Sequence, residues 1–437
     1  MFLKLSPSPK PSMEHTPDLQ KLFEVNDSNA LAALPETFRD VSSELLEAYE
    51  AQPRAVVATA LAITAAALGS YATVAVPQSG RRVNLGFNVV VCIHGSRTPG
   101  WIDLLRAPLL GPIFDMQLLL GDQGPDVAQR MIKQSTETLA TARKANPNPD
   151  LLKVLEQDLA RKRAGLRPAL LSNHFTPAHL ERVIDGCFDG SVMLTDPAGD
   201  PVESFLALKT GDQRDLVRLL NCSWEGVPLA FEQRVRSGSI SMFWVTQEEM
   251  LLPLGDTAMV TGALPPPVLW MGSPVNRLRG TKHGIPSEKV WKKVIEVFLN
   301  FRCQHRTEAF QLSDEAEVVV SQFESEIEAC FAAHGTSQAR HLIWLPELAR
   351  RVAVVCTVLN GGTDPAIPAE AATTAVLVVR WLAAEHLRVL LTFDAVPVSP
   401  GADMSTVTDR SDPAEVMLRK IRQKAPVSRR QPCHRFY

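Results

Sequence analysis

Hydrophobic positions follow two periods along this chain, and the change falls near residue 280. Before that point, short apolar runs predict strands that alternate with segments of helical spacing. The strand-like runs lie at 71–76, 88–93, 169–172, 191–195 and 240–246. After it, apolar residues recur with helical spacing at 287–301, 313–333, 345–359 and 369–391. The pattern predicts an α/β fold, with a mainly parallel sheet and flanking helices, followed by an all-helical segment.

The first part of the chain predicts a disordered start and two helices. Residues 1–30 are rich in Pro, Ser and charge, which favours disorder. Pro35 to Glu50 has the pattern of an amphipathic helix, and Pro53 suits the first turn of the next one. Ala55 to Val76 has no charged residue and is long enough to span a bilayer. Because it is rich in Ala and becomes strand-like after Gly69, we interpret it as a buried helix and a strand, with a membrane span as the alternative.

A polar, helix-favouring insertion at 126–163 interrupts the alternation of strands and helices. Asn146 to Asp150 reads Asn-Pro-Asn-Pro-Asp, which predicts a turn between two helices of a projecting hairpin. The predicted organisation is a disordered segment at 1–30, an α/β domain at 31–280 that carries the hairpin, a helical domain at 281–395, and a linker with a basic tail at 396–437.

Composition narrows the class of protein without identifying it. The net charge of −3 over 437 residues argues against a chain that coats nucleic acid along its whole length. The stretch from Arg419 to Tyr437 is basic and contains no acid, which suits a solvated end or, as the alternative, a nucleic-acid arm. The seven cysteines form no Cys-x-x-Cys pair, which favours the cytoplasm and argues against a structural zinc site.

The most informative local pattern is a strand, a glycine-containing loop and a helix start over 88–110. The loop His94 to Gly100 reads His-Gly-Ser-Arg-Thr-Pro-Gly. In a phosphate loop, backbone N–H groups surround the phosphate, Lys adds charge and Ser or Thr places Mg²⁺. Here Thr98 stands where the Lys is expected, and Pro99 where the Ser or Thr is expected. By itself, this segment fits an ordinary strand–turn–helix junction better than a nucleotide site.

Two further strand ends carry polar residues that suit the same kind of site. Asp196 follows the run at 191–195, and an acid in this place holds Mg²⁺ in P-loop ATPases. Pro197 replaces the Glu that would orient the attacking water. Gln247 ends the next strand and could sense a γ-phosphate. Each of these positions alone also fits an ordinary turn.

Together, these segments resemble the YfjI-like family of bacterial prophages and mobile elements, over roughly residues 31–393. The family-like stretches are Gly95-Ser96-Arg97-Thr98-Pro99, Leu170-Leu171-Ser172, Thr176-Pro177, Leu194-Thr195-Asp196-Pro197, Val245-Thr246-Gln247 and the run at 345–353. The resemblance implies a primase–helicase-like P-loop NTPase, with a RecA- or AAA-like core and a C-terminal helical lid. It implies DNA, other replication proteins of the element and copies of the chain itself as partners.

The resemblance also implies roles for individual residues. Gly95, Ser96, Arg97 and Thr98 would bind the nucleotide, and Asp196 would hold Mg²⁺ and act in catalysis. Gln247 and Arg351 would be the other catalytic residues, with Arg351 as a nucleotide-sensing residue from the lid. An exposed position on its helix is an equal alternative for Arg351.

The chain departs from the family at four functional positions. Thr98, Pro99, Pro197 and Pro266 replace Lys, the Mg²⁺-ligating Ser, the catalytic Glu and an Arg. Each loss should cost orders of magnitude in turnover, so we expect no ATP hydrolysis and weak or absent binding of ATP and Mg²⁺. Two alternatives stay open. One is an active nucleic-acid-stimulated ATPase in which Arg97 replaces Lys, and the other is a nucleic-acid-binding or scaffold protein that acts through its basic tail.

Overall fold

The computed structural model describes most of the chain up to Asp394. The described residues are 22–77, 80–93, 98–109, 124–145, 149–165, 171–186, 190–195, 200–231, 235–236, 238–254, 257, 259, 267–273, 285–303, 308–334, 342–362 and 364–394. The predictions for Gly95, Ser96, Arg97, Asp196, Pro197, Pro266, the first 21 residues and the basic tail therefore lie outside the described residues.

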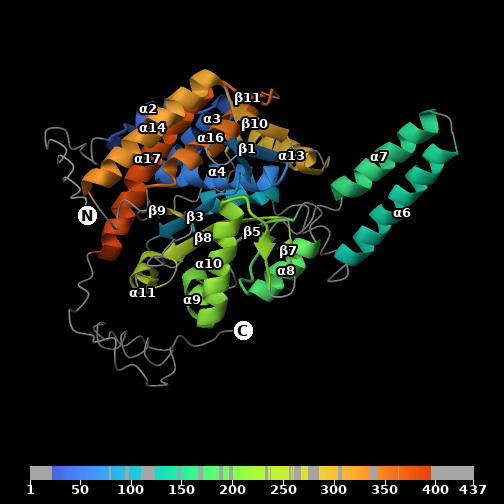
Figure 1. The fold of residues 1–437 in the computed structure, drawn as a ribbon, viewed down its shortest axis with the longest axis horizontal. Coiled ribbons are helices and arrows are strands. Elements are labelled where there is room, and N and C mark those ends of the chain that lie inside the picture. The colour runs from blue at the N-terminus through green and yellow to red at the C-terminus, as the bar shows by residue number, and fades with distance from the viewer. Residues whose placement is uncertain are drawn as a thin grey trace, which may run out of the picture. The chain divides into compact units, whose positions relative to one another are not determined.

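A five-stranded parallel sheet lies at the centre of the described fold (Figure 1). Its strands are β3 (Asn88–Ile93), β4 (Leu171–Ser172), β5 (Ser191–Leu194), β8 (Ser239–Gln247) and β9 (Leu269–Ser273). Their order across the sheet is β4-β5-β8-β3-β9, and every neighbouring pair is parallel. The first of these strands along the chain thus lies between the last two. This arrangement confirms the α/β class and the parallel sheet.

Helices cover both faces of this sheet, and the residues of β3 show the alternation. Val89 and Val91 belong to one hydrophobic cluster with α4 (Pro53–Leu68). Val90 and Cys92 belong to a second cluster with α10 (Thr210–Trp224). Because both faces are covered, all six residues of β3 are buried, which explains its continuous apolar run.

Helix α4 is buried along almost its whole length, as the sequence predicts. Pro53 is in its first turn, and Gln52 caps it by accepting a hydrogen bond from Ala55 N at 2.6 Å. The helix ends at Gly69, whose φ of 53° suits a residue without a side chain. Within the described part of the chain, no helix is long and apolar enough to cross a membrane.

A second, four-stranded sheet joins segments that are far apart in the sequence. Its order is β11 (Ala366–Ile367), β10 (Glu308–Leu312), β1 (Ala72–Val76) and β2 (Arg81–Asn84). Strand β1 pairs in parallel with β10 and antiparallel with β2. The apolar pattern predicts β1 but not β2, β9 or β10. In β2 only Val83 is buried, so the strand shows no apolar run.

Most of the remaining helices lie close to their predicted ranges, but those at 27–33, 201–206 and 251–254 were not predicted, and the first of them begins inside the segment 1–30 that was expected to be disordered. In the first part they are α2 (Asp27–Ala33) and α3 (Glu36–Tyr49), and between the strands of the main sheet α8 (Pro177–Gly186), α9 (Pro201–Leu206) and α11 (Leu251–Leu254), the last after the short 3-10 turn η3 (Glu248–Met250). The later helices are α13 (Glu288–Cys303), α14 (Asp314–His334), α16 (Leu345–Leu359) and α17 (Ala369–Asp394). Strands β6 (Leu229–Ala230) and β7 (Val235–Arg236) form a small antiparallel pair.

The predicted hairpin is present as α6 (Gly124–Lys144) and α7 (Pro149–Gly165), which lie side by side (Figure 1). Arg143 Nη2 and Glu156 Oε1 form an ion pair between the two helices at 2.8 Å. Residues 146–148, where the Asn-Pro turn is predicted, lie outside the described residues.

The helices after residue 280 share a core with the helices before the sheet. One cluster contains Val57 of α4, Trp291 of α13, Val352 of α16 and Trp381 of α17. The chain up to Asp394 accordingly forms one compact unit. The boundary predicted near residue 280 therefore does not separate two hydrophobic cores.

Candidate functional site

The strand order directs attention to the carboxyl ends of β3 and β8. After β3 the chain crosses to β4 at one edge of the sheet, whereas after β8 it passes to β9 on the other side of β3. In open α/β sheets, ligands bind outside the carboxyl ends of strands at such a reversal. Ile93, the last residue of β3, is aligned with Gln247 of β8. The structure thus brings Gln247 beside the start of the predicted phosphate loop.

The described part of the loop shows how the next helix begins. Thr98 is partly buried, Pro99 is buried, and the residues from Gly100 to Leu109 are helical. Ile102 N donates a hydrogen bond to Pro99 O at 3.1 Å, so the first helical turn starts directly after the proline. Pro99 has no N–H to offer an anion. The predicted strand and helix are present, with Thr98 and Pro99 directly before the helix, and residues 94–97 of the loop lie outside the described residues.

An aspartate that the sequence analysis did not assign as a site residue organises the end of β8. The Asp200 carboxylate accepts hydrogen bonds from Val202 N at 2.8 Å and Glu203 N at 3.2 Å, and so caps α9. Its second oxygen accepts from Gln247 N at 3.0 Å, and Thr246 Oγ1 lies 2.9 Å from both oxygens. Asp200 therefore positions Thr246 and Gln247, and the Asp-Pro pair at 200–201 was the sequence signal for its capping role.

The predicted metal ligand follows a strand in the same part of the sheet. Strand β5 pairs with β8 and ends at Leu194, two residues before Asp196. The buried Thr195 donates from its backbone N to Ser172 O at 2.8 Å, which continues the pairing with β4. The role of Asp196 stays a prediction. Within the described ranges, no group of three or more His, Cys, Asp or Glu side chains could hold a metal ion.

Arg351 lies away from this end of the sheet, which corrects both interpretations of it. Its side chain is fully buried, with 0% exposure, so it is not a solvated helix residue. Its guanidinium donates to Gly86 O at 2.9 Å, to Trp224 O and to Glu347, and lies 3.7 Å from the centre of the Trp224 ring. Burial lowers the pKa of Arg351, and the charge of Glu347 opposes that shift.

The position of Gly86 shows why Arg351 cannot reach the loop. Gly86 precedes β3, so Arg351 lies at the amino end of the strand whose carboxyl end leads into the loop. Six strand residues at roughly 3.3 Å each separate the two ends by about 20 Å. Arg351 therefore fastens α16 to the amino end of the sheet and does not contact a nucleotide bound at the other end.

Helix α17 supplies charged groups beside the last strand, β9. Gly272 N donates to Glu385 Oε1 at 3.0 Å, and Trp270 N donates to His386 Nδ1 at 3.2 Å. These bonds satisfy backbone donors on the outer side of an edge strand, which would otherwise be open to pairing. Arg388 in turn pairs with Glu385, through Nε at 3.0 Å and Nη2 at 2.7 Å. The acid and His within the apolar run at 381–387 were the only sequence signal for this contact.

The pKa of the Cys92 thiol depends on the charges around this end of the sheet. Burial raises its pKa strongly, the charges of Glu248 and Glu385 raise it further, and Arg388 opposes them. Cys92 therefore stays protonated and is no nucleophile. The buried Ser273 Oγ, aligned in register with Ile93, has no hydrogen-bond partner within the described part of the chain.

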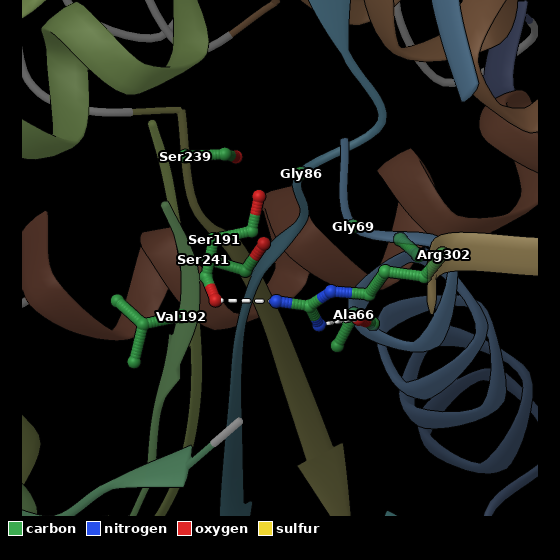
Figure 2. A pocket seen from close by; sticks show the side chains of 9 residues that line it. Ala66, Gly69, Gly86, Ser191, Val192, Ser239, Ser241 and Arg302 are labelled. Carbon is green, nitrogen blue, oxygen red and sulfur yellow. Dashed lines mark hydrogen bonds between the residues drawn. The ribbon is translucent and has the colours of Figure 1, made fainter. Parts of the chain in front are cut away.

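A small pocket lies at the opposite, amino end of the sheet (Figure 2). Ser191, Ser239 and Ser241 line it from the starts of β5 and β8, together with Gly86 and Arg302. Arg302 donates to Ala66 O at 3.0 Å and to Ser191 O at 2.6 Å. The pocket has a volume of about 10 Å³, which is room for about one water molecule, so it is too small to bind a nucleotide.

Comparison with known proteins adds no relative. No protein-family model matches this chain, and no curated protein matches it significantly in sequence.

Proposed function

We propose that this chain is a degenerate, primase–helicase-like ATPase-fold protein of a mobile element, which does not hydrolyse ATP and serves as a non-catalytic, DNA-replication-associated subunit. The observation that carries the proposal is the strand order β4-β5-β8-β3-β9. Open α/β sheets bind ligands outside the carboxyl ends of their strands, at the point where the strand order reverses. In this chain the loop at 94–99 follows β3, which occupies that place.

The position of the other predicted segments supports the same proposal. Asp196 follows β5, and Gln247 is the last residue of β8. Strand β8 is the neighbour of β3 on one side, and β5 lies next to β8. Three polar segments that the sequence separates by more than 40 residues thus end neighbouring parallel strands. Because all five strands are parallel, the residues at their carboxyl ends meet at one edge of the sheet, which is where open α/β sheets bind ligands.

The same positions argue against turnover. A Thr at position 98 supplies no positive charge, and Pro99 supplies neither a metal ligand nor an N–H. Because catalysis of phosphoryl transfer depends on positioning and charge stabilisation, these losses remove its main sources. ATP and Mg²⁺ are the ligands that the site would hold, and loss of hydrolysis leaves binding and assembly as the activities of the protein.

Hydrolysis by the purified full chain tests the proposal directly. We expect its ATPase rate to equal that of the double variant Thr98→Ala, Asp196→Ala. Robust hydrolysis that this double variant abolishes would overturn the proposal and favour the active ATPase.

A repair variant tests the ancestry of the site independently of hydrolysis. We expect Thr98→Lys with Pro99→Ser to increase the affinity for a fluorescent, non-hydrolysable ATP analogue in the presence of Mg²⁺, by about tenfold or more. Thr138→Lys, which adds the same charge on the exposed surface of α6, should leave that affinity unchanged. An equal effect of the two changes would mean that position 98 does not face a nucleotide.

A further inference from the structure

We propose that Arg388 of α17 supplies the positive charge for a polyphosphate at the carboxyl end of the sheet, in place of the Lys that is missing at position 98. This inference rests on the proposed function, because it assumes that the degenerate site still binds phosphate.

Arg388 lies against the last strand of the sheet, β9. The side chain lies directly against the backbone of Gly272, because a Cβ placed there would be only 2.2 Å from Arg388 Nη2 and 2.6 Å from Glu385 Oε1. Gly272 is aligned in register with Cys92, the residue before the last of β3. The guanidinium therefore lies at the end of β9 next to the strand that leads into the loop.

Several contacts hold this turn of α17 against β9. Glu385 and His386 bind the N–H groups of Gly272 and Trp270, which fixes this turn of α17 along β9. Val389 and Leu390, which follow Arg388, belong to the same hydrophobic cluster as Trp270. A cation on a helix turn with such anchors costs little entropy when it binds an anion.

Arg388 keeps the N–H donors of Nη1 for a ligand. Its hydrogen bonds to Glu385 use Nε and Nη2, and Nη1 donates to no acceptor within the described residues. The side chain is 57% exposed, whereas that of Glu385 is only 5% exposed. Hydrogen bonding to Glu385 raises the pKa of Arg388, so the guanidinium is charged at neutral pH.

The charge balance predicts the form of the ligand. Glu385 pairs with Arg388 and also with Arg54, whose Nη1 lies 3.8 Å from Glu385 Oε2, and Glu248 is close enough to raise the pKa of both Arg388 and Cys92. These carboxylates oppose a bare polyanion, so we expect a polyphosphate to bind as its Mg²⁺ complex, which carries less negative charge. The shared chemistry is a triphosphate chain, either of a nucleotide or free.

The test measures binding of two probes to the full chain, with and without Mg²⁺. The probes are a fluorescent, non-hydrolysable ATP analogue and inorganic tripolyphosphate as its competitor. We expect Arg388→Gln to weaken the binding of both by about tenfold, because it removes a charge-assisted hydrogen bond. Equal competition by tripolyphosphate would assign recognition to the phosphates, and a much weaker competition would assign part of it to the nucleoside.

The chain offers a matched control in Arg218 of α10. Like Arg388, it pairs with an acid three residues earlier, Asp215, and its side chain is 51% exposed. We expect Arg218→Gln to leave both affinities within about twofold. Arg388→Lys, which keeps the charge but loses the two-pronged pairing with Glu385, should retain more of the affinity than Arg388→Gln.

The outcomes separate this inference from the proposed function. Unchanged binding in Arg388→Gln, or an equal loss in Arg218→Gln, overturns the role of Arg388 alone. If neither the unchanged chain nor the Thr98→Lys, Pro99→Ser variant binds either probe, both this inference and the proposed nucleotide-site ancestry fall.

Discussion

The two ends of the parallel sheet use arginine in opposite ways. At the amino end, Arg302 and Arg351 are 3% and 0% exposed and donate to backbone carbonyls. At the carboxyl end, Arg388 is 57% exposed and pairs with the single acid Glu385. A buried guanidinium must use its donors within the protein, whereas an exposed one keeps donors for a ligand. The comparison suggests that one end of the sheet holds the fold together and the other is open to binding.

The same difference separates the arginines of the two helices that follow the sheet, α16 and α17. Arg350 and Arg351 are adjacent in α16, and both are buried with acidic partners, Glu317 and Glu347. Neither is available to a ligand. Arg388 lies in the next helix, α17, and is exposed. The sequence pattern of these helices does not show which of the three arginines is exposed.

The largest expected effect is at Arg351. The variant Arg351→Met should lower the free energy of unfolding by about 3–5 kcal/mol, because it leaves Glu347 and two carbonyl oxygens without their buried partner. Urea unfolding followed by circular dichroism measures the change. Arg39→Met, which removes a half-exposed side chain whose only ion pair within the described residues is with Asp40, should change the free energy of unfolding by no more than about 0.5 kcal/mol. Equal stability of the two variants would remove the structural role of Arg351.

A smaller loss is expected at Arg302. Arg302→Met removes the donors for Ala66 O and Ser191 O, and should cost about 2–3 kcal/mol in the same experiment. Since both acceptors are far from the loop, the affinity for the fluorescent ATP analogue should not change. A selective loss of affinity at full stability would show that the amino end of the sheet also takes part in binding.

Asp200 provides the intermediate case, because it is structural but lies at the carboxyl end. Asp200→Ala should cost about 1–2 kcal/mol, since α9 loses its cap. Hydrogen exchange should also quicken at the amide of Gln247, which loses its acceptor. Unchanged exchange at Gln247 would contradict the positioning role of Asp200.

The smallest effect is a difference in thiol reactivity. Burial raises the pKa of Cys356 to about 12, and burial raises that of Cys92 strongly as well, so both hold their proton at pH 8. We expect iodoacetamide at pH 8 to label the partly exposed Cys222 before either of them, as mass spectrometry of native protein would show. If the carboxyl end opens in solution, Cys92 should react faster than Cys356. Rapid labelling of Cys356 would contradict a closed core.

Several elements could be predicted because their signals are local. Residues 345–359 carry helical spacing, and α16 spans Leu345–Leu359. Pro53 and Gly69 mark the beginning and end of α4 through their backbone preferences. Strands β2 and β10 were missed because only one residue of each is buried, so neither shows an apolar run, and their pairing with β1 joins segments that are not visible in a local pattern.

The candidate site could be predicted only in outline. An acid or amide at a strand end suggests a site at the carboxyl edge, and the register of Ile93 with Gln247 agrees with that. The roles of Asp200 and Arg388 depend on which partners lie beside them, and no spacing reveals those partners. Arg351 shows the reverse error, since a charged residue on an apolar helix can be buried when carbonyls and an acid surround it.

The amino-acid sequence alone determined the α/β class, most helix boundaries and the absence of a positive charge at Thr98 and of an N–H at Pro99. These follow from periodicity, turn residues and the identity of side chains, all of which act over a few neighbouring residues. The strand order, the burial of Arg351 and the contact of Arg388 with Gly272 were decided only by the tertiary structure. Gly86 and Arg351 are 265 residues apart, and Gly272 and Glu385 are 113 apart, so these contacts arise from packing rather than from local preference.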